Sequence, residues 1–322
     1  MQYGSIPGIA KPVSRLVQGS IMISSSNVPE CFYLLDSILD MGCNTFDTAH
    51  VYGGGDNERT FGRWLRERGN RDKVNIIGKG AHLSQDRKRV TPWDITSDIY
   101  DSLARFKIDH IDIYLLHRDD PDFPVGPIVE ALHEHKKAGR ILAYGGSNWS
   151  HQRVAEANAY AAAHGLDPFV ASSPNFTLAV QNQPPWEGCI SISAADAQPA
   201  RDYYANLKMP LFTWSSLAGG FFSGRLRRDN LESFETYLDK LAVTTYANEE
   251  NFRRLDRVQQ LADEKGLSIP QVATAYVMSY PLNIFALVGC QTADEFKANM
   301  AASEIRLTPA EMAWLELKSD SR

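Results

Sequence analysis

The sequence predicts an α/β protein built as a (β/α)8 barrel, and three observations support this prediction. Short strand-like apolar runs alternate with longer stretches of helical periodicity, which is typical of a parallel sheet made of strand–helix units. Eight such runs are present. Five successive runs end at residues 47, 79, 117, 147 and 172, so their ends lie 25 to 38 residues apart. A barrel of about 250 residues needs roughly 31 residues per unit, which matches this spacing.

The predicted elements follow one another along the chain as strand and helix. The strands are expected at residues 15–17, 44–47, 74–79, 111–117, 143–147, 169–172, 211–215 and 285–288. Helices are expected near residues 28–41, 57–69, 94–107, 126–138, 150–164, 196–207 and 248–280. Helix start signals such as Ser150 and Thr91–Pro92 support this assignment. Long loops at 177–192 and 215–248 would follow strands six and seven, on the face where barrel active sites form.

A doubly wound open sheet is the structural alternative, because it uses the same strand–helix units. It would place a G-x-G-x-x-G turn directly after the first strand. After Val17 the chain instead reads QGSIMISSS, with one glycine. No linker-like or low-complexity stretch divides the chain, so we expect residues 1–322 to form a single domain.

Composition and charge limit the classes of function. The chain is 43% apolar with a net charge of −6, and it has no strongly basic run, so neither nucleic acid nor an anionic membrane is the expected partner. The four cysteines show no C-x-x-C or His-paired spacing, which argues against a metal site or a disulfide framework. No signal segment or membrane-length apolar run is evident. We expect a cytoplasmic protein with a small-molecule partner; the sequence leaves its oligomeric state open.

Four chemically reactive side chains stand at or just beyond the ends of three successive predicted strands. Asp47 closes the second strand and Tyr52 follows it, while Lys79 closes the third strand and His117 the fourth. Strand ends of a barrel converge on one face, so these side chains would share a pocket. Each residue alone has an ordinary structural explanation, such as a turn acid or a loop lysine, but their conjunction favours catalysis.

This set of side chains is suited to proton transfer. A free tyrosine titrates near pH ~10 and needs help to act near neutrality. We expect Lys79 to lower the pKa of Tyr52, Asp47 to keep Lys79 charged, and neutral His117 to orient a carbonyl oxygen. The glycines at 53–55 fit neither phosphate-loop pattern and are expected to let the chain turn away from the pocket.

The chain resembles the aldo-keto reductase superfamily in six ordered segments. They read FDTAHVYGGGDNE, IIGKG, IDIYLLHRDDP, GGSN, LFTWSSLAGGFFSG and GCQTADEFKAN, within residues 14–302. The resemblance implies a (β/α)8 barrel with an N-terminal hairpin cap that interconverts aldehydes or ketones and alcohols with NADP(H) or NAD(H), without a Rossmann fold. It also implies that Tyr52 is the general acid, that Asp47 and Lys79 tune it, and that His117 positions the carbonyl group.

The resemblance further assigns a cofactor site. It implies that Ser147 and Asn148 hold the nicotinamide carboxamide and that Trp214 stacks on the ring. The whole implied cofactor-binding set is Ser20, Ile21, Asp47, Ser147, Asn148, Ser173, Trp214, Ser215, Leu217, Gly219, Arg225, Gln291, Glu295 and Asn299. The residues expected either to line the substrate pocket or to pack in the core are His50, Trp149, Phe176, Trp186 and Phe222.

Two departures from the family pattern concern the cofactor. Ser173 stands where the family usually has a glutamine that contacts the carboxamide. Gln291 and Glu295 stand where NADP-preferring members tend to place basic residues. Thr292 and Glu295 also form a capping-box pattern, which explains them structurally. The family favours NADP(H) and these residues favour NAD(H), so both cofactors stay open.

Two other functions are compatible with a barrel of this kind. A cofactor-binding regulatory subunit of the same fold with little catalytic activity, like the potassium-channel β subunits, is the alternative, and the complete Asp-Tyr-Lys-His set favours the enzyme. A metal-dependent hydrolase would need a His-x-His or multi-carboxylate cluster at the strand ends, which the sequence lacks, so no metal is expected.

Overall fold

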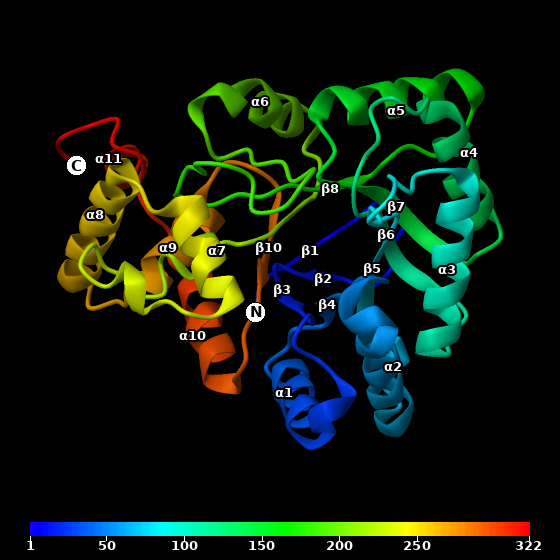
Figure 1. Ribbon diagram of the computed structural model, residues 1–322, viewed down its shortest axis with the longest axis horizontal. Coiled ribbons are helices and arrows are strands. Elements are labelled where there is room, and N and C mark those ends of the chain that lie inside the picture. The colour runs from blue at the N-terminus through cyan, green and yellow to red at the C-terminus, as the bar shows by residue number, and fades with distance from the viewer.

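The computed structural model describes residues 1–322 and contains a closed barrel of eight parallel strands with helices around it (Figure 1). The barrel strands are β3 (Leu16–Gly19), β4 (Thr45–Asp47), β5 (Asn75–Gly80), β6 (Ile111–Leu116), β7 (Ile141–Ser147), β8 (Ala171–Ser173), β9 (Leu211–Thr213) and β10 (Ile284–Val288). All eight predicted strands are present. The sheet closes where Ala286 of β10 pairs with Leu16 of β3, so the predicted (β/α)8 barrel is confirmed and the open sheet is excluded.

Eleven α-helices accompany the barrel. They are α1 (Val28–Asp40), α2 (Asp56–Arg68), α3 (Pro92–Phe106), α4 (Val125–Lys137), α5 (His151–His164), α6 (Gln198–Leu207), α7 (Tyr237–Tyr246), α8 (Glu249–Lys265), α9 (Ile269–Ser279), α10 (Ala293–Ser303) and α11 (Pro309–Leu315). The first six match the predicted helices. None of the eleven has both the length and the apolar character required to span a bilayer.

The C-terminal helices correct the sequence-based assignment. The predicted helix at 248–280 is two helices, because Gly266 ends α8 in a left-handed conformation and Ser268 caps α9 with a complete capping box. Helix α7 lies within the segment 215–248 that was expected to be a loop. Its N-cap is Thr236, whose hydroxyl accepts a hydrogen bond from the Asp239 amide.

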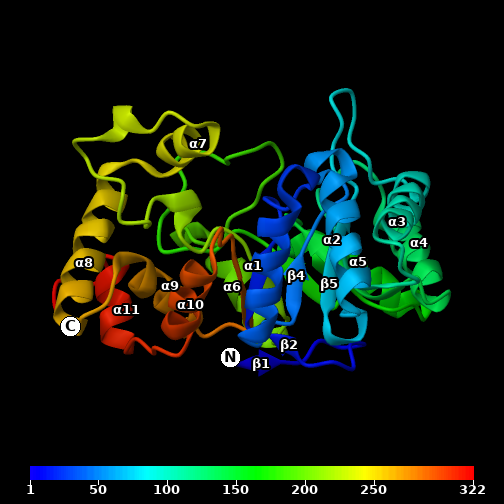
Figure 2. The same cartoon turned by 90° about the horizontal axis from the view of Figure 1, so that it is seen from below.

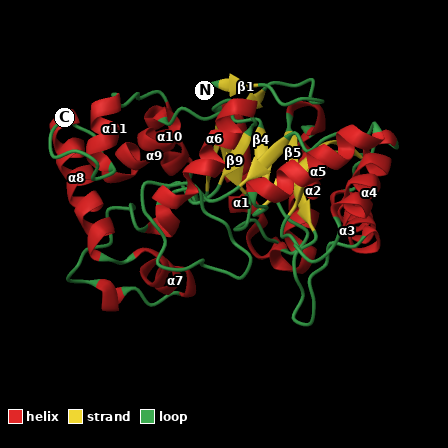
Figure 3. Ribbon diagram, turned by 90° about the horizontal axis from the view of Figure 1, so that it is seen from above, coloured by secondary structure: helices red, strands yellow, loops and turns green.

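An antiparallel hairpin closes one end of the barrel. Its strands are β1 (Tyr3–Gly4) and β2 (Val13–Ser14). Figures 2 and 3 show this hairpin at the edge of the molecule opposite α7. Ile6 and Val13 are buried against side chains of the barrel interior, including Phe285. The expected N-terminal cap is therefore present, and the other end of the barrel is left to the loops that follow the strands.

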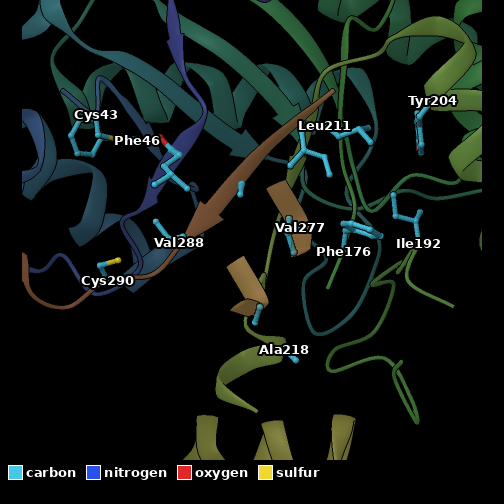
Figure 4. Close-up of a cluster of buried hydrophobic side chains, with 14 of the residues drawn as sticks. Cys43, Phe46, Phe176, Ile192, Tyr204, Leu211, Ala218, Val277, Val288 and Cys290 are labelled. Atoms are coloured by element: carbon cyan, nitrogen blue, oxygen red, sulfur yellow. Dashed lines mark hydrogen bonds between the residues drawn. The ribbon is translucent and has the colours of Figure 1, made fainter. Parts of the chain in front are cut away.

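Two hydrophobic clusters stabilise this arrangement. One of 11 buried residues fills the barrel interior, and one of 65 lies between the strands and the helices. Figure 4 shows part of the larger cluster, in which Leu211 and Val288 from strands and Val277 from α9 appear with Phe176 and Ile192 from the loop after β8. Because this loop contributes side chains to the core, it is anchored where it passes the C-terminal strand ends.

The contact between α2 and α3 requires a glycine. A Cβ atom added at Gly62 of α2 would overlap the backbone of Phe106 at the end of α3. Alanine has the higher helix propensity by about 1 kcal/mol. Overpacking costs about 1 to 3 kcal/mol, and here the obstacle is backbone that cannot rotate away. We therefore expect Gly62→Ala to lower the free energy of unfolding by about 1 to 2 kcal/mol, measured by urea denaturation.

Gly126→Ala in α4 is the matched control for this prediction. An added Cβ there would meet the ring edge of Tyr160, a partly exposed side chain that can move. The control should lose less stability than Gly62→Ala. A Gly62→Ala protein as stable as the wild type would contradict the packing argument.

Candidate functional site

A buried ion pair joins the ends of β4 and β5. Asp47 is the last residue of β4, and Lys79 stands one residue before the end of β5. The Lys79 Nζ atom lies 2.6 Å from Asp47 Oδ1, and it donates hydrogen bonds of 2.7 Å to Asp47 Oδ2 and 2.9 Å to the Thr48 carbonyl oxygen. Both residues are 3% exposed. Parallel pairing of β4 with β5 therefore places the acid and the amine in direct contact.

Tyr52 and His117 complete a group of four side chains. The Tyr52 ring centroid lies 5.3 Å from Lys79 Nζ and 5.9 Å from the centroid of the His117 ring, which it meets edge-on. His117 follows β6 directly, and its amide donates to the Gly80 carbonyl oxygen. The structure thus brings together the acid, phenol, amine and imidazole that the sequence places 70 residues apart from first to last.

The glycines after Tyr52 redirect the chain into α2. Gly53, Gly54 and Gly55 all have positive φ, at 56°, 60° and 90°. A Cβ at Gly55 would also lie 2.6 Å from the guanidinium carbon of Arg105. Arg105 is held there by Glu58 of α2, 2.9 Å away. Left-handed turns and this close approach both require glycine, so the expected conformational role of the triplet is confirmed.

Burial dominates the protonation of the tyrosine. Loss of solvation raises the pKa of Tyr52, and the charge of Lys79 opposes this rise only in part. Lys79 therefore lowers the pKa of Tyr52 as expected, but burial outweighs it, so the pKa of Tyr52 stays above its ordinary value. Burial alone would lower the pKa of Lys79, but Asp47 raises it above the usual value. At neutral pH the site holds a neutral phenol beside a charged ammonium.

His117 is a neutral ring with an unused nitrogen. Burial, followed by the charge of Lys79, lowers the pKa of His117 well below its ordinary value. Its Nδ1 atom is buried without a hydrogen-bond partner. A buried nitrogen without a partner at a strand end is a feature of binding sites, because its unpaired state costs stability that a ligand would recover.

Two neighbours of His117 were not predicted from the sequence. The ring of His82 lies edge-on to that of His117, with centroids 4.9 Å apart. The Arg118 guanidinium donates to the carbonyl oxygens of His117 and Glu187, at 2.8 and 2.9 Å. Both lie within three residues of a predicted site residue. Their positions in the sequence did not predict that they would lie at the site, because a side chain beyond a strand end has no fixed direction.

The carboxamide set predicted at the ends of β7 and β8 forms one hydrogen-bonded cluster. Ser147 Oγ donates to the Ser173 carbonyl oxygen at 3.1 Å, and Ser173 Oγ donates to that of Phe212 at 2.7 Å. Asn148 donates to the His117 carbonyl oxygen at 3.2 Å and accepts from the Ile190 amide at 3.2 Å. Ser147, Asn148 and Ser173 therefore lie together beside His117. The hydroxyl groups of Ser147 and Ser173 both donate to carbonyl oxygens of the protein, so each can only accept a hydrogen bond from a ligand.

The segment after β9 presents unpaired donors. The buried indole nitrogen of Trp214 has no partner, and the backbone amides of residues 215–217 have none within the protein. Ser215 has a φ of 57° and Gly219 of 63°, so the chain folds tightly here. Clustered backbone amides of this kind form an anion site. This donor set is suited to a pyrophosphate, the cofactor group that the family resemblance places against Ser215, Leu217 and Gly219.

Other residues of the implied cofactor set are more widely spread. Ser20 donates to the Asp47 carbonyl oxygen at 2.8 Å, whereas Ile21 is 58% exposed. Arg225 is largely exposed and pairs with Asp239 at 3.0 Å. Asn299 is buried in α10, where it accepts from the Thr274 hydroxyl at 3.0 Å.

The start of α10 is stabilised by its own side chains. Thr292 accepts from the Glu295 amide at 3.2 Å, and Glu295 accepts from the Gln291 amide at 2.8 Å. Thr292 therefore caps α10 as predicted. The Glu295 carboxylate accepts its bond from the amide of Gln291, whereas a standard capping box would use the amide of Thr292. The carboxylate of Glu295 occupies part of the positive helix end, where a phosphate would otherwise be favoured.

The candidate substrate-lining residues divide into two groups. Trp149, Phe176 and Phe222 are at most 1% exposed and belong to the hydrophobic core between strands and helices. Their burial leaves no surface for a substrate, so they are assigned to packing. His50 is partly exposed, 3.1 Å from Asp101, and Trp186 is 41% exposed with its indole donating to Tyr237 of α7. These two remain candidates for the pocket wall.

Two surface hollows lie away from this group of side chains. One of about 420 Å³ is lined by residues including Arg66, Arg71 and His110, and one of about 370 Å³ by residues including Pro7 and Met209. Both are built from segments that precede strands, at the hairpin end of the barrel. We therefore place the functional site at the C-terminal ends of the strands, where the reactive side chains converge, and not in either hollow.

Comparison with known proteins agrees with this geometry. The model of the Aldo/keto reductase family matches residues 15–320. A probable aryl-alcohol dehydrogenase of Saccharomyces cerevisiae is 26% identical, over 91% of this chain and 89% of that protein. A probable voltage-gated potassium channel subunit beta of Oryza sativa subsp. japonica is 26% identical, over 96% of this chain and 94% of that protein. The structure of a glycerol dehydrogenase from Gluconobacter oxydans has a TM-score of 0.77 at 22% identity, covering 98% and 94% of the two chains, and shows the shared fold.

The ion pair at the centre of the site makes a prediction about stability. Lys79→Met leaves the Asp47 carboxylate buried without a counter-charge, which should cost about 3 to 5 kcal/mol in the free energy of unfolding. The double variant Asp47→Asn/Lys79→Met removes both charges and should recover at least half of that loss. Urea denaturation of the two single variants, the double variant and the wild type measures this coupling.

The same single variant should show a distinctive pH dependence. Burial already raises the pKa of Asp47, and Lys79 opposes that rise. Without Lys79 the folded state takes up a proton at a higher pH than the unfolded state. Lys79→Met should therefore gain stability relative to the wild type as the pH falls from about 8 to about 5. Equal stability of single and double variants, or the opposite pH slope, would contradict the ion-pair assignment.

Proposed function

Because this chain belongs to the aldo/keto reductase family, we propose that it interconverts a small carbonyl compound and its alcohol at the site formed by Asp47, Tyr52, Lys79 and His117. Family membership makes the chain an NAD(P)H-dependent oxidoreductase. The observation that supports the site is the buried ion pair of Lys79 and Asp47, 2.6 Å apart, next to a phenol and a neutral imidazole.

The residues around the strand ends fit a nicotinamide nucleotide. Ser147 and Asn148 would hold the carboxamide, and Ser173 offers a hydroxyl lone pair where the family usually has an amide. Trp214, whose indole nitrogen has no partner, would lie against the ring. The unpaired amides of residues 215–217 would bind the pyrophosphate. When bound, the nucleotide supplies or accepts the hydride at the carbonyl carbon.

Tyr52 is proposed to move the proton. In the reductive direction its phenol gives a proton to the substrate oxygen as the carbon gains a hydride, so a carbonyl group becomes an alcohol. The remaining phenolate is stabilised by Lys79, which Asp47 holds as an ammonium ion. The raised pKa of Tyr52 keeps the proton on the phenol until the substrate oxygen becomes basic. Oxidation of the alcohol runs the same steps in reverse.

His117 is proposed to orient the substrate oxygen. Its ring is neutral and lies edge-on to Tyr52, so a hydrogen bond from the imidazole and one from the phenol would converge on one oxygen. A neutral ring donates without carrying a charge that would compete with the phenol for the proton.

We further infer that NAD(H) binds more tightly than NADP(H). Glu295 lies in the first turn of α10, and its carboxylate accepts a hydrogen bond from the Gln291 backbone amide. Within the family-like segment GCQTADEFKAN, residues 289–296 contain no lysine or arginine, and the first basic residue is the exposed Lys297. An acidic residue there repels a 2′-phosphate and accepts a hydrogen bond from a ribose hydroxyl.

Removal of the phenolic hydroxyl tests the proton-transfer role. Tyr52→Phe should reduce kcat for an aromatic aldehyde by about 100- to 10,000-fold, because the positioned proton donor is lost while the ring remains. Nucleotide affinity, followed by quenching of tryptophan fluorescence, should change little. Tyr33→Phe is the matched control. Tyr33 is an exposed residue of α1, so this variant should keep full activity. Full activity of Tyr52→Phe would show that another group supplies the proton.

Neutralising the acid at α10 tests the cofactor preference. Glu295→Gln keeps an acceptor for the Gln291 amide but removes the charge, so it should improve NADPH affinity relative to NADH by at least about fivefold. Fluorescence titration with each nucleotide measures the ratio. Glu304→Gln, at the far end of α10, should leave the ratio unchanged. A wild type that binds NADPH more tightly than NADH would refute the preference.

A further inference from the structure

Arg118 is a buried cation at the edge of the proposed catalytic site. It is 6% exposed, close to the 8% of its neighbour His117. Its guanidinium donates to the carbonyl oxygens of His117 and Glu187 and, at 3.3 Å, to Cys189 Sγ. Gly188 lies over its aliphatic stem, where an added Cβ would come within 3.1 Å of Cδ. Arg118 therefore joins the end of β6 to the loop that follows β8.

No carboxylate balances this guanidinium. Asp119, the next residue, pairs with Arg153 at 2.9 Å, and Asp120 pairs with Lys88 at 2.9 Å. Three bonds use three of the five N–H groups of Arg118, which leaves one N–H on each terminal nitrogen. Buried Arg201 also lacks a carboxylate, but its four bonds to two carbonyl oxygens and Gln198 use four of its five N–H groups.

The charge of Arg118 reaches the reacting groups. After burial and Lys79, it contributes to the lowered pKa of His117, and it opposes the burial-driven rise in the pKa of Tyr52. Asp47 and Lys79 cancel each other in charge, and burial lowers the pKa of His82 so that this ring is neutral as well. The site consequently has one excess positive charge, located on Arg118.

We propose that Arg118 selects carbonyl substrates that carry a carboxylate or a similar small anion, with its two free N–H groups as the docking point. This inference rests on the proposed function and names a substrate class for the same site. A planar guanidinium is a donor suited to a carboxylate, and a buried cation without a carboxylate partner gains most from binding one. The opposite end of such a substrate then presents its carbonyl group toward Tyr52 and His117.

A pair of isosteric ligands tests the charge preference without turnover. Calorimetric titration of the purified protein, with NAD+ and NADP+ both present, compares benzoate with its neutral analogue benzamide. Benzoate should bind at least about tenfold more tightly to the wild type. Arg118→Met should bring the two dissociation constants to within about twofold, and Arg118→Lys should retain part of the preference because it keeps the charge but loses the planar fork.

The outcomes separate this inference from the proposed function. Equal binding of the two ligands to the wild type overturns the role of Arg118 whether or not the Arg118 variants fold. A benzoate preference that survives in folded Arg118→Met also overturns it, because the anion then docks elsewhere, for example at Tyr52 and Lys79. Reduction of 4-carboxybenzaldehyde and of neutral 4-nitrobenzaldehyde is assayed separately. Turnover of both at equal kcat/KM supports the oxidoreductase and refutes the selection of anions.

Discussion

The buried contact between Asp47 and Lys79 is the constraint on which the rest of the site depends. A lysine that is 3% exposed is stable as an ammonium ion only with a counter-charge, and Asp47 supplies it at 2.6 Å. The contact exists because β4 and β5 pair in parallel, with Asp47 opposite Ile77, so that Lys79 lies two residues beyond the end of β4 on the face of β5 that carries Ile77. This fixed charge lies beside Tyr52. In the proposed mechanism it would offset part of the cost of forming a buried phenolate, so the register of two strands would determine the energetics of proton transfer.

The loops that surround this pair are held by buried polar groups rather than left free. Asn175 accepts from Ser191 and Gln181 and donates to the Trp214 carbonyl oxygen and to Tyr246. It therefore connects the loop after β8, the segment after β9 and α7. Arg118 and Asn148 attach the same loop to the ends of β6 and β7. A site with so many fixed connections is preorganised, which lowers the cost of ordering it when ligands bind.

The sequence predicted the barrel and the convergence of Asp47, Lys79 and His117 because both depend on the spacing of strands. Strand spacing sets the fold, and a residue at a strand end has a known destination, so Lys79 and His117 could be placed from their positions alone. The position of a residue in the sequence did not determine the pKa of its side chain. The pKa of Tyr52 rises because burial outweighs Lys79, and the degree of burial depends on side chains contributed by distant segments.

Residues in the connecting segments were harder to predict for the same physical reason. Helix α7 lies in a stretch with few periodic apolar residues, and its three buried residues contact tertiary neighbours. Trp149 and Phe222 follow strand ends as the site residues do, yet their side chains turn into the core. Beyond a strand end the direction of a side chain is set by packing, so the sequence did not distinguish Arg118, whose guanidinium lies at the edge of the site, from Trp149, whose ring packs in the core.

The central claim is that a hydride passes directly between a nicotinamide and a carbonyl carbon above Tyr52 and His117. The most direct measurement supplies reduced nucleotide deuterated at both C4 positions together with an aromatic aldehyde, and analyses the alcohol by NMR. Direct hydride transfer would give one deuterium on the carbinol carbon and none on the hydroxyl oxygen after exchange with water. Alcohol formed without deuterium at that carbon, or no alcohol from folded protein saturated with nucleotide, would contradict it.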